Sequence, residues 1–484
     1  MKNEQRVQHK LSRRSFAQSV AGGSLIVGVN ACTERGAAGS EKDSETPSDG
    51  WPLFAGTLHL DDSTRRTYAR DYGQIVHAYP LAVLLPGSVD DIALAVRFAR
   101  RKGLRIAARG HGHQPFGQAQ VSGGLVIDMR SLQTIHSVDD NYIDVDAGAD
   151  WRTVLTATLN HARTPPVLPA YLGLTVGGTL SIGGVGVATL HHGAQVDQVR
   201  ALQVVTGEGI VLRCSPSEHP DLFDAVLAGQ GQCGIITRAE LCLGPARPMV
   251  REYVLPYAEP TTLLADQLAI SQDGRFDGAV ALILPSAEGW SYSLQALRHF
   301  APPDLPDDAA LMTGLRHIAG SEQSRDVSYR EHADARAPFD PMQAHADLGL
   351  LIPGPDAARF IGNALPRLTA SDLGSANAMR VFAWNRSVFK RRLFRVPQAE
   401  TCVYVAFIRA ETTDPVIVQH MLEGNRTLFE ENRRLGGALY PFCALKLTRE
   451  DWQQHYHEAW PTLIDAKHRY DPDNVFAAGP NLRG

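Results

Sequence analysis

Two histidines stand among glycines in the sequence IAARGHGHQPFGQ, and these residue types are suited to chemistry. His111 and His113 are one residue apart, and the loop around them holds three glycines, Gly110, Gly112 and Gly117. Glycine permits positive φ angles and lets a ligand approach the backbone closely. Backbone N–H groups in such a loop can face an anion. A histidine there could bind a metal, move a proton or carry a cofactor.

A metal site is the weaker of these interpretations. His111 and His113, together with His191 and His192, offer imidazole groups. No cysteine or carboxylate stands beside either pair at the spacing that metal ligands usually have. We therefore predict no metal site.

Length and charge limit the class of protein. The chain has 484 residues, of which 44% are hydrophobic and 20% are charged. This length predicts more than one domain, and the composition allows a sizeable core. Lys plus Arg number 47 against 52 Asp plus Glu. The slightly acidic balance argues against nucleic acid as a partner.

The N-terminus has the pattern of an export signal. Arg13 and Arg14 stand in tandem before Phe16, and a short apolar run follows from 21 to 31. Eleven residues are too few to span a bilayer, so we interpret residues 1–33 as a twin-arginine signal peptide. Cys32 is a candidate for lipid attachment. Export would make the protein periplasmic, secreted or lipid-anchored outside the cytoplasm.

Residues 34–50, rich in Gly, Ser, Glu and Asp, predict a flexible linker after the signal. Five further cysteines have spacings that specify no disulfide framework: Cys214, Cys233, Cys242, Cys402 and Cys443. We predict that most of them are buried thiols.

Regular elements begin near Tyr79. The sequence predicts a strand at 79–88 and a helix at 88–103, with Ser88 and Asp91 as a capping box and Gly103 at the C-terminal end. The histidine loop follows another apolar run, which is typical of a strand. Further strands, a helix from Asp150 and a hairpin at 199–214 come next.

A second glycine-rich stretch, LTVGGTLSIGGVGVATLHHG, has no ionisable residue before His191. We infer a buried or ligand-lined loop. Gly229, Gly231 and Gly234 match the dinucleotide fingerprint GxGxxG, but the pattern predicts a helix before them and a strand after them. That order is the reverse of a Rossmann site, which we therefore reject.

Prolines 245 and 248 mark a boundary, after which strand-like and helical runs alternate as far as Gly437. In the last segment, Thr448 and Asp451 predict a helix cap. Trp452, Tyr456 and Trp460 stand at i, i+4 and i+8, which predicts a buried aromatic face. We expect Pro461 to break or restart this helix.

Several motifs together resemble the cytokinin dehydrogenases, within the vanillyl-alcohol-oxidase and berberine-bridge group of flavoproteins. They are ARGHGHQPFGQA, YLGLTVGGTLSIGG, HGAQVDQVRALQVVTGEG, DLFDAVLAGQGQCGIITRAEL and the final DWQQHY with AKHRYDPDNV. They cover Tyr79 to Leu243 and the last fifty residues, whereas the region between matches less clearly.

The resemblance implies an α+β, two-domain FAD-binding fold of the PCMH type. It places an FAD-binding domain at 51–245, an α/β substrate-binding domain at 246–437, and a C-terminal segment at 438–484 that returns to the FAD domain. It also implies that His113 is bonded covalently to the flavin. Tyr171 stands where related bicovalent enzymes have a cysteine, so we expect one covalent link.

The other flavin contacts that the resemblance implies are Ala108, Gly110, His111, Gly112, Gln114, Gln118, Thr175, Ser181, Val185, Ile236 and Tyr440. A flavin needs backbone donors for its phosphates and an apolar slot for its rings. The implied reaction is hydride transfer from a C–N or C–OH bond of a small molecule to FAD, with oxygen or a quinone as the acceptor.

One residue departs from the family pattern. Cytokinin dehydrogenases have an Asp before the Tyr of YLxLTVGG, where it accepts a proton from the substrate amine, and here that residue is Ala170. His191 and Asp197 are weak candidates for a substitute base. The alternatives are a flavoenzyme that acts on a sugar, an alcohol or a secondary metabolite, and an exported lipoprotein that binds a ligand without catalysis.

Overall fold

The computed structural model describes residues 50–335, 343–374, 378–410, 414–477, 479–480 and 482. The predicted signal peptide, Cys32 and nearly all of the predicted linker lie outside these residues. No helix in the described ranges is long and apolar enough to cross a membrane.

The first part of the chain forms two main sheets. A four-stranded sheet has the order β1 (Thr57–His59), β2 (Ala82–Leu85), β4 (Leu125–Asp128), β3 (Ile106–Arg109), and β2, β4 and β3 are parallel. An antiparallel five-stranded sheet has the order β5 (Ile135–Val138), β6 (Tyr142–Asp146), β10 (Ile235–Cys242), β8 (Val199–Val205), β9 (Val211–Cys214). A small two-stranded sheet pairs β7 (Arg163–Thr164) with β11 (Gly244–Pro245).

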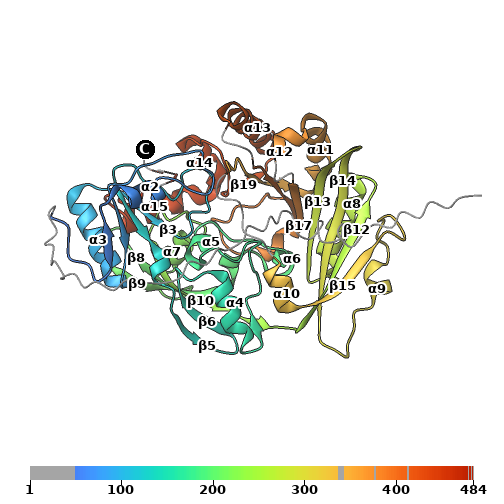
Figure 1. The fold of residues 1–484 in the computed structure, drawn as a ribbon, viewed down its shortest axis with the longest axis horizontal. Coiled ribbons are helices and arrows are strands. Elements are labelled where there is room, and N and C mark those ends of the chain that lie inside the picture. Colours follow the sequence, from blue (N-terminus) through green and yellow to red (C-terminus); the bar gives the residue numbers. More distant parts are fainter. Residues whose placement is uncertain are drawn as a thin grey trace, which may run out of the picture.

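The second part is built on one antiparallel eight-stranded sheet (Figure 1). Its order is β15 (Gln323–Ser328), β12 (Met249–Tyr257), β14 (Gly289–Phe300), β13 (Gly278–Ser286), β17 (Ala378–Asn385), β18 (Thr401–Ile408), β16 (Leu348–Pro353), β19 (Ala438–Tyr440). The strand-like runs predicted in this region correspond to β13, β16 and β18. Most of its strands are apolar, and most neighbouring strands pair over six to nine residues.

Helices cover these sheets. In the first part they are α2 (Asp62–Tyr68), α3 (Val89–Lys102), α4 (Trp151–Leu159), α5 (Val176–Leu180), α6 (Thr189–His192) and α7 (Pro220–Val226). In the second they are α8 (Pro260–Asp273), α9 (Asp308–Met312), α10 (Tyr329–Asp334), α11 (Gly354–Ala364), α12 (Ala370–Leu373) and α13 (Pro415–Arg434). Short 3₁₀ turns lie at η1 (Met129–Ser131), η2 (Gln195–Gln198), η3 (Leu365–Arg367), η4 (Arg386–Val388) and η5 (His457–Ala459).

Helix α3 begins and ends where the sequence predicted, but the predicted capping box is wrong. Ser88 caps it by accepting a hydrogen bond from Asp91 N at 3.4 Å, and Gly103 ends it in the left-handed region. The Asp91 carboxylate does not return to Ser88. It accepts hydrogen bonds from the N–H groups of Ala55, Gly56 and Gly87 at 2.7–2.8 Å. Its tertiary partners therefore replace the predicted capping box.

The C-terminal segment returns to the first part. Helices α14 (Arg449–Tyr456) and α15 (Trp460–Tyr470) are separated by η5, as the position of Pro461 predicted. Figure 1 shows α15, in red, among the blue and green elements. The rings of Trp452, Tyr456 and Trp460 stack with centroids 5.9 Å and 6.5 Å apart. These contacts confirm the predicted aromatic face.

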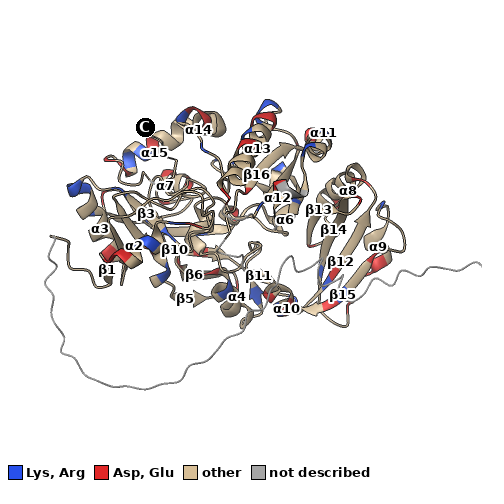
Figure 2. Ribbon diagram, turned by 45° about the horizontal axis from the view of Figure 1, so that its top comes forward, with Lys and Arg blue, Asp and Glu red and all other residues tan. Residues whose placement is uncertain are grey.

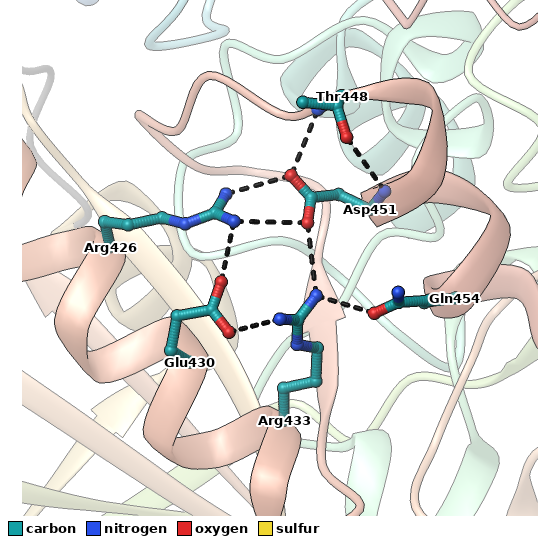
Figure 3. Close-up of polar contacts among 6 residues, drawn as sticks. All are labelled: Arg426, Glu430, Arg433, Thr448, Asp451 and Gln454. Carbon is teal, nitrogen blue, oxygen red and sulfur yellow. Dashed lines mark hydrogen bonds and ion pairs between the residues drawn. The ribbon is translucent and has the colours of Figure 1, made fainter.

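Helix α14 is also tied to α13 of the second part. Thr448 and Asp451 form the predicted capping box, and Asp451 accepts hydrogen bonds from Arg426 at 2.9 Å and Arg433 at 3.2 Å (Figure 3). Glu430 bridges the two arginines. Figure 2 shows acidic and basic residues together on α13. Charges of opposite sign therefore join the C-terminal segment to the second part.

Candidate active site

The histidine loop continues directly from β3, and its glycines are required by geometry. Gly112 and Gly117 have φ angles of 66° and 81°, which other residues rarely adopt. A Cβ at Gly110 would stand 2.1 Å from Thr175 Oγ1. Thr175 caps α5 by accepting a hydrogen bond from Gly178 N at 3.3 Å. The two glycine-rich stretches therefore pack directly against each other.

Asp71, which the sequence analysis did not single out, holds the far end of this loop. Its buried carboxylate accepts hydrogen bonds from Gly117 N at 2.6 Å and Gly73 N at 3.0 Å. Burial raises the pKa of Asp71 to about 7. No motif around Asp71 signalled this contact, because its partner Gly117 lies 46 residues away.

The loop offers free donors. Within the described ranges, the backbone N–H groups of Gly110, His111, Gly112 and Gln114 have no hydrogen-bond acceptor. The buried Oε1 atom of Gln114 has no partner there either. Buried polar groups are normally satisfied, so such a set indicates a polar ligand. Successive backbone N–H groups in a loop suit a phosphate.

His113 lies among aromatic rings. Its centroid is 4.1 Å from that of Tyr72, 5.5 Å from Phe442 and 5.6 Å from Tyr171. Burial lowers the pKa of His113 to about 3. The imidazole is therefore neutral near pH 7 and keeps a nitrogen lone pair that can form a bond. The side chain of His111 is exposed.

Tyr72 connects His113 to a buried carboxylate. Its ring stacks on His345, with centroids 4.0 Å apart, and its hydroxyl donates to Asp347 Oδ2 at 3.0 Å. Asp347 Oδ1 accepts from Arg409 N at 2.7 Å. Burial raises the pKa of Asp347 to about 6. No sequence motif indicated this cluster, because its members come from segments outside the glycine-rich motifs.

A cavity of about 1220 Å³ is lined by residues of both parts of the molecule. All of the positions expected to contact the flavin line it: Ala108, Gly110, His111, Gly112, His113, Gln114, Gln118, Thr175, Ser181, Val185, Ile236 and Tyr440. Gly231 lines it as well, with helix α7 before it and strand β10 after it. A Rossmann site would need a strand before the glycines and a helix after them, so this order agrees with our rejection of that site.

Ala170 also lines the cavity, and its methyl group has no polar atom to offer. Among the described residues, two carboxylates line the same cavity, those of Glu252 and Asp347. Glu252 is held by His332 Nδ1 and Arg325 Nε, both at 2.7 Å. Burial alone would raise the pKa of Glu252, but these two partners lower it overall. Glu252 is therefore an ion-paired carboxylate at neutral pH.

The two weak candidates for a base lie elsewhere. His191 Nε2 is 2.6 Å from the carbonyl oxygen of Phe276. Asp197 accepts hydrogen bonds from Ala194 N and Lys390 N, both at 2.8 Å. Neither is among the described residues that line the cavity. Both therefore have structural partners where they stand, and their geometry does not favour a role as base.

Within the described ranges, the cysteines are free thiols and the histidines belong to no metal-binding cluster. Cys214, Cys233, Cys402 and Cys443 are buried free thiols, as predicted, and Cys242 is free and half-buried. Across the part of the chain that the structure describes, no group of three or more His, Cys, Asp or Glu side chains is arranged to hold a metal ion.

These residues fit FAD. The free N–H groups beside Gly110 suit the pyrophosphate, and the rings around His113 offer an apolar slot for the isoalloxazine. A cavity of about 1220 Å³ exceeds what a drug-sized ligand needs, so it has room for a dinucleotide and a small substrate.

Comparison with known proteins agrees with this assignment. A family described as FAD binding domain matches residues 80–215, and one described as cytokinin dehydrogenase 1, FAD and cytokinin binding matches residues 307–482. The structure of 6-hydroxy-D-nicotine oxidase from Arthrobacter nicotinovorans superimposes with a TM-score of 0.71 at 22% identity, over 89% of this chain and 98% of that one. The fold and the site define an FAD-binding oxidoreductase of the PCMH type.

The relatives narrow the class to a family. An uncharacterised oxidoreductase of the fasciation locus of Rhodococcoides fascians is 36% identical, over 88% of this chain and 99% of the relative. Cytokinin dehydrogenase 9 of rice, Oryza sativa subsp. japonica, is 31% identical, over 86% of this chain and 88% of the relative. The chain belongs to the cytokinin dehydrogenase family. The match at 307–482 also reaches the region where the sequence motifs resembled that family less clearly.

Proposed function

We propose that the protein holds FAD by one covalent bond from His113 and oxidises a C–N or C–OH bond of a small organic molecule. The observation that carries the proposal is the neutral, half-buried imidazole of His113 on the wall of a cavity that fits FAD. When bound, FAD would supply the acceptor for a hydride and its two electrons. Oxygen or a quinone would then reoxidise the flavin.

The protein's own groups bind and orient. The loop N–H groups hold the phosphates, while Tyr72 and Phe442 set the plane of the His113 ring. Tyr171, whose ring centroid is 5.6 Å from that of His113, stands at the position where bicovalent relatives have a cysteine, and it has no thiol to form a second bond. Mostly apolar side chains of the eight-stranded sheet line one wall of the cavity, and such surroundings strengthen the electrostatic interactions inside it.

The covalent bond is tested by colour. Acid-precipitated wild-type protein should stay yellow, whereas His113→Ala should release all of its flavin. His111→Ala is the matched control, because it changes the neighbouring histidine of the same loop, and it should keep the flavin bound. A colourless wild-type pellet would refute the bond.

The substrate class is tested by anaerobic bleaching of the flavin. Curated relatives are named cytokinin dehydrogenases, so isopentenyladenine is the first donor to try. Ala170 has no proton acceptor, and this favours donors that are not amines, such as alcohols or sugars. Bleaching by isopentenyladenine alone would favour the amine. A protein that binds ligands tightly but is bleached by no donor would be a binding protein.

We also propose that the protein is exported in its folded, flavin-loaded form. Arg13 and Arg14 support this, since the twin-arginine route carries folded proteins. Replacing both arginines by lysine should keep the yellow protein in the cytoplasm. Labelling with palmitate that is lost in Cys32→Ser would establish the lipid anchor.

A further inference from the structure

One face of the eight-stranded sheet closes the cavity, and it carries a cation in mostly apolar surroundings. Side chains alternate along a strand, so Ala378, Arg380 and Phe382 of β17 share the face that lines the cavity. On the neighbouring strands, Leu282 pairs directly with Arg380 from β13, and Ala406 pairs with it from β18. Both of these neighbours also line the cavity.

The charge of Arg380 is poorly compensated. Among the described residues, its guanidinium has no hydrogen-bond or ion-pair partner. Burial lowers the pKa of Arg380, and the nearby carboxylate of Asp347 opposes that effect. Arginine nevertheless stays protonated in proteins. The Arg380 side chain is half-buried and lines the cavity, so its guanidinium can donate to an anion that enters there.

Asp347 does not satisfy Arg380. Its two carboxylate oxygens accept hydrogen bonds from Tyr72 Oη and from Arg409 N. Asp347 therefore acts on Arg380 through space, and its partial negative charge weakens the attraction of Arg380 for another anion. The donors of the guanidinium fork remain available.

We propose that Arg380 binds a carboxylate of the substrate, so that the molecule oxidised is a small organic acid with an apolar body. This inference rests on the proposed function. A planar guanidinium matches a carboxylate with two parallel hydrogen bonds, and the residues beside Arg380 suit an apolar body. The aspartate that the family pattern has at position 170 would repel an anionic substrate. This chain has Ala170 there, which carries no charge.

Calorimetry on the flavin-loaded protein tests the inference with three pairs of probes. Each pair is an acid and its neutral amide: acetate and acetamide, phenylacetate and phenylacetamide, and 3-phenylpropanoate and 3-phenylpropanamide. At least one acid should bind about 10-fold or more tightly than its amide, because a bond between charged groups is worth at least that factor. If no acid binds more tightly than its amide, the inference is overturned.

Variants assign the effect to Arg380. Arg380→Met should abolish the preference for the acid, and Arg380→Lys should keep part of it, because lysine retains the charge without the fork. Asp347→Asn should tighten binding of the acid by removing the opposing charge. An unchanged preference in Arg380→Lys and Arg380→Met, or tighter binding of inorganic phosphate than of any acid, would overturn the proposal.

The same samples separate this inference from the proposed function. Flavin content after acid precipitation tests the covalent bond, whereas calorimetry measures binding of the probes without turnover. A protein whose acid pellet is colourless, but which still prefers the acids in calorimetry, would refute the covalent bond and support the anion site. A yellow protein without the preference would refute only the anion site.

Discussion

Lys467 of α15 is fully buried, and removing its charge should destabilise the protein strongly. Its Nζ donates to Asp471 Oδ2 at 2.6 Å, to the carbonyl of Phe476 at 2.8 Å and to the carbonyl of Gln232 at 2.9 Å. Both Lys467 and Asp471 have 0% exposed side chains. Phe476 lines the cavity, so this lysine holds the C-terminal tail against the flavin site.

Lys467→Met should lower the free energy of unfolding by about 3–5 kcal/mol, the usual effect of leaving one member of a buried ion pair alone. The loss should stay within that range because Asp471 keeps hydrogen bonds from Val475 N and Phe476 N. In Lys467→Met/Asp471→Asn the loss should be smaller than the sum of the two single losses by about 0.5–3 kcal/mol.

Urea unfolding of the flavin-loaded protein measures these differences. Arg367→Met is the control, since Arg367 and Glu431 form an ion pair with 46% and 29% of their side chains exposed, and such a pair contributes no more than about 1 kcal/mol. If Lys467→Met is no less stable than Arg367→Met, or if the two changes at 467 and 471 are additive, the reasoning is refuted.

Three further predictions follow from the site. Gly110→Ala should lose bound FAD because its Cβ would stand 2.1 Å from Thr175 Oγ1, while Gly362→Ala, with open space around it, should keep the flavin content of the wild type. Asp71→Ala leaves the half-buried N–H of Gly117 without its acceptor, whereas Gly73 N keeps the carbonyl of Gln114, so the change should cost about 1–3 kcal/mol in urea unfolding; an unchanged midpoint would contradict this. Burial raises the pKa of Asp347 to about 6, so the stability from its extra bound proton is present at pH 4 and is lost as the pH rises through 6. The free energy of unfolding of Asp347→Asn should therefore rise relative to wild type by up to about 3 kcal/mol between pH 4 and 7, and a pH-independent difference would rule this out.

Local signals predicted much of the fold. Ser88 and Gly103 set the ends of α3, Pro461 separates α14 from α15, and the strand runs of the second half were recognisable from their apolar residues. The carboxylate of Asp91 was misassigned because its three partners are contributed by the turn before α3 and by a segment about 35 residues away. A capping pattern in the sequence does not report such competitors.

The residues that line the cavity could be predicted only where they belong to sequence motifs. The loop of His113 and the stretch after Tyr171 were recognised from their glycines and from the resemblance. Tyr72 and Asp347 meet across 275 residues of sequence, and Arg380 reaches the cavity through the pairing of β17 with β13 and β18. Strand pairing over such distances leaves no spacing signal, so these groups could be found only from the structure.

The central claim is the bond between His113 and FAD. Trypsin should release the peptide from Gly110 to Arg130, which contains both histidines of the loop. Mass spectrometry of this peptide from the purified protein should show the added mass of the flavin, with fragmentation placing it on His113. A peptide of unmodified mass, or a flavin located on His111, would contradict the account.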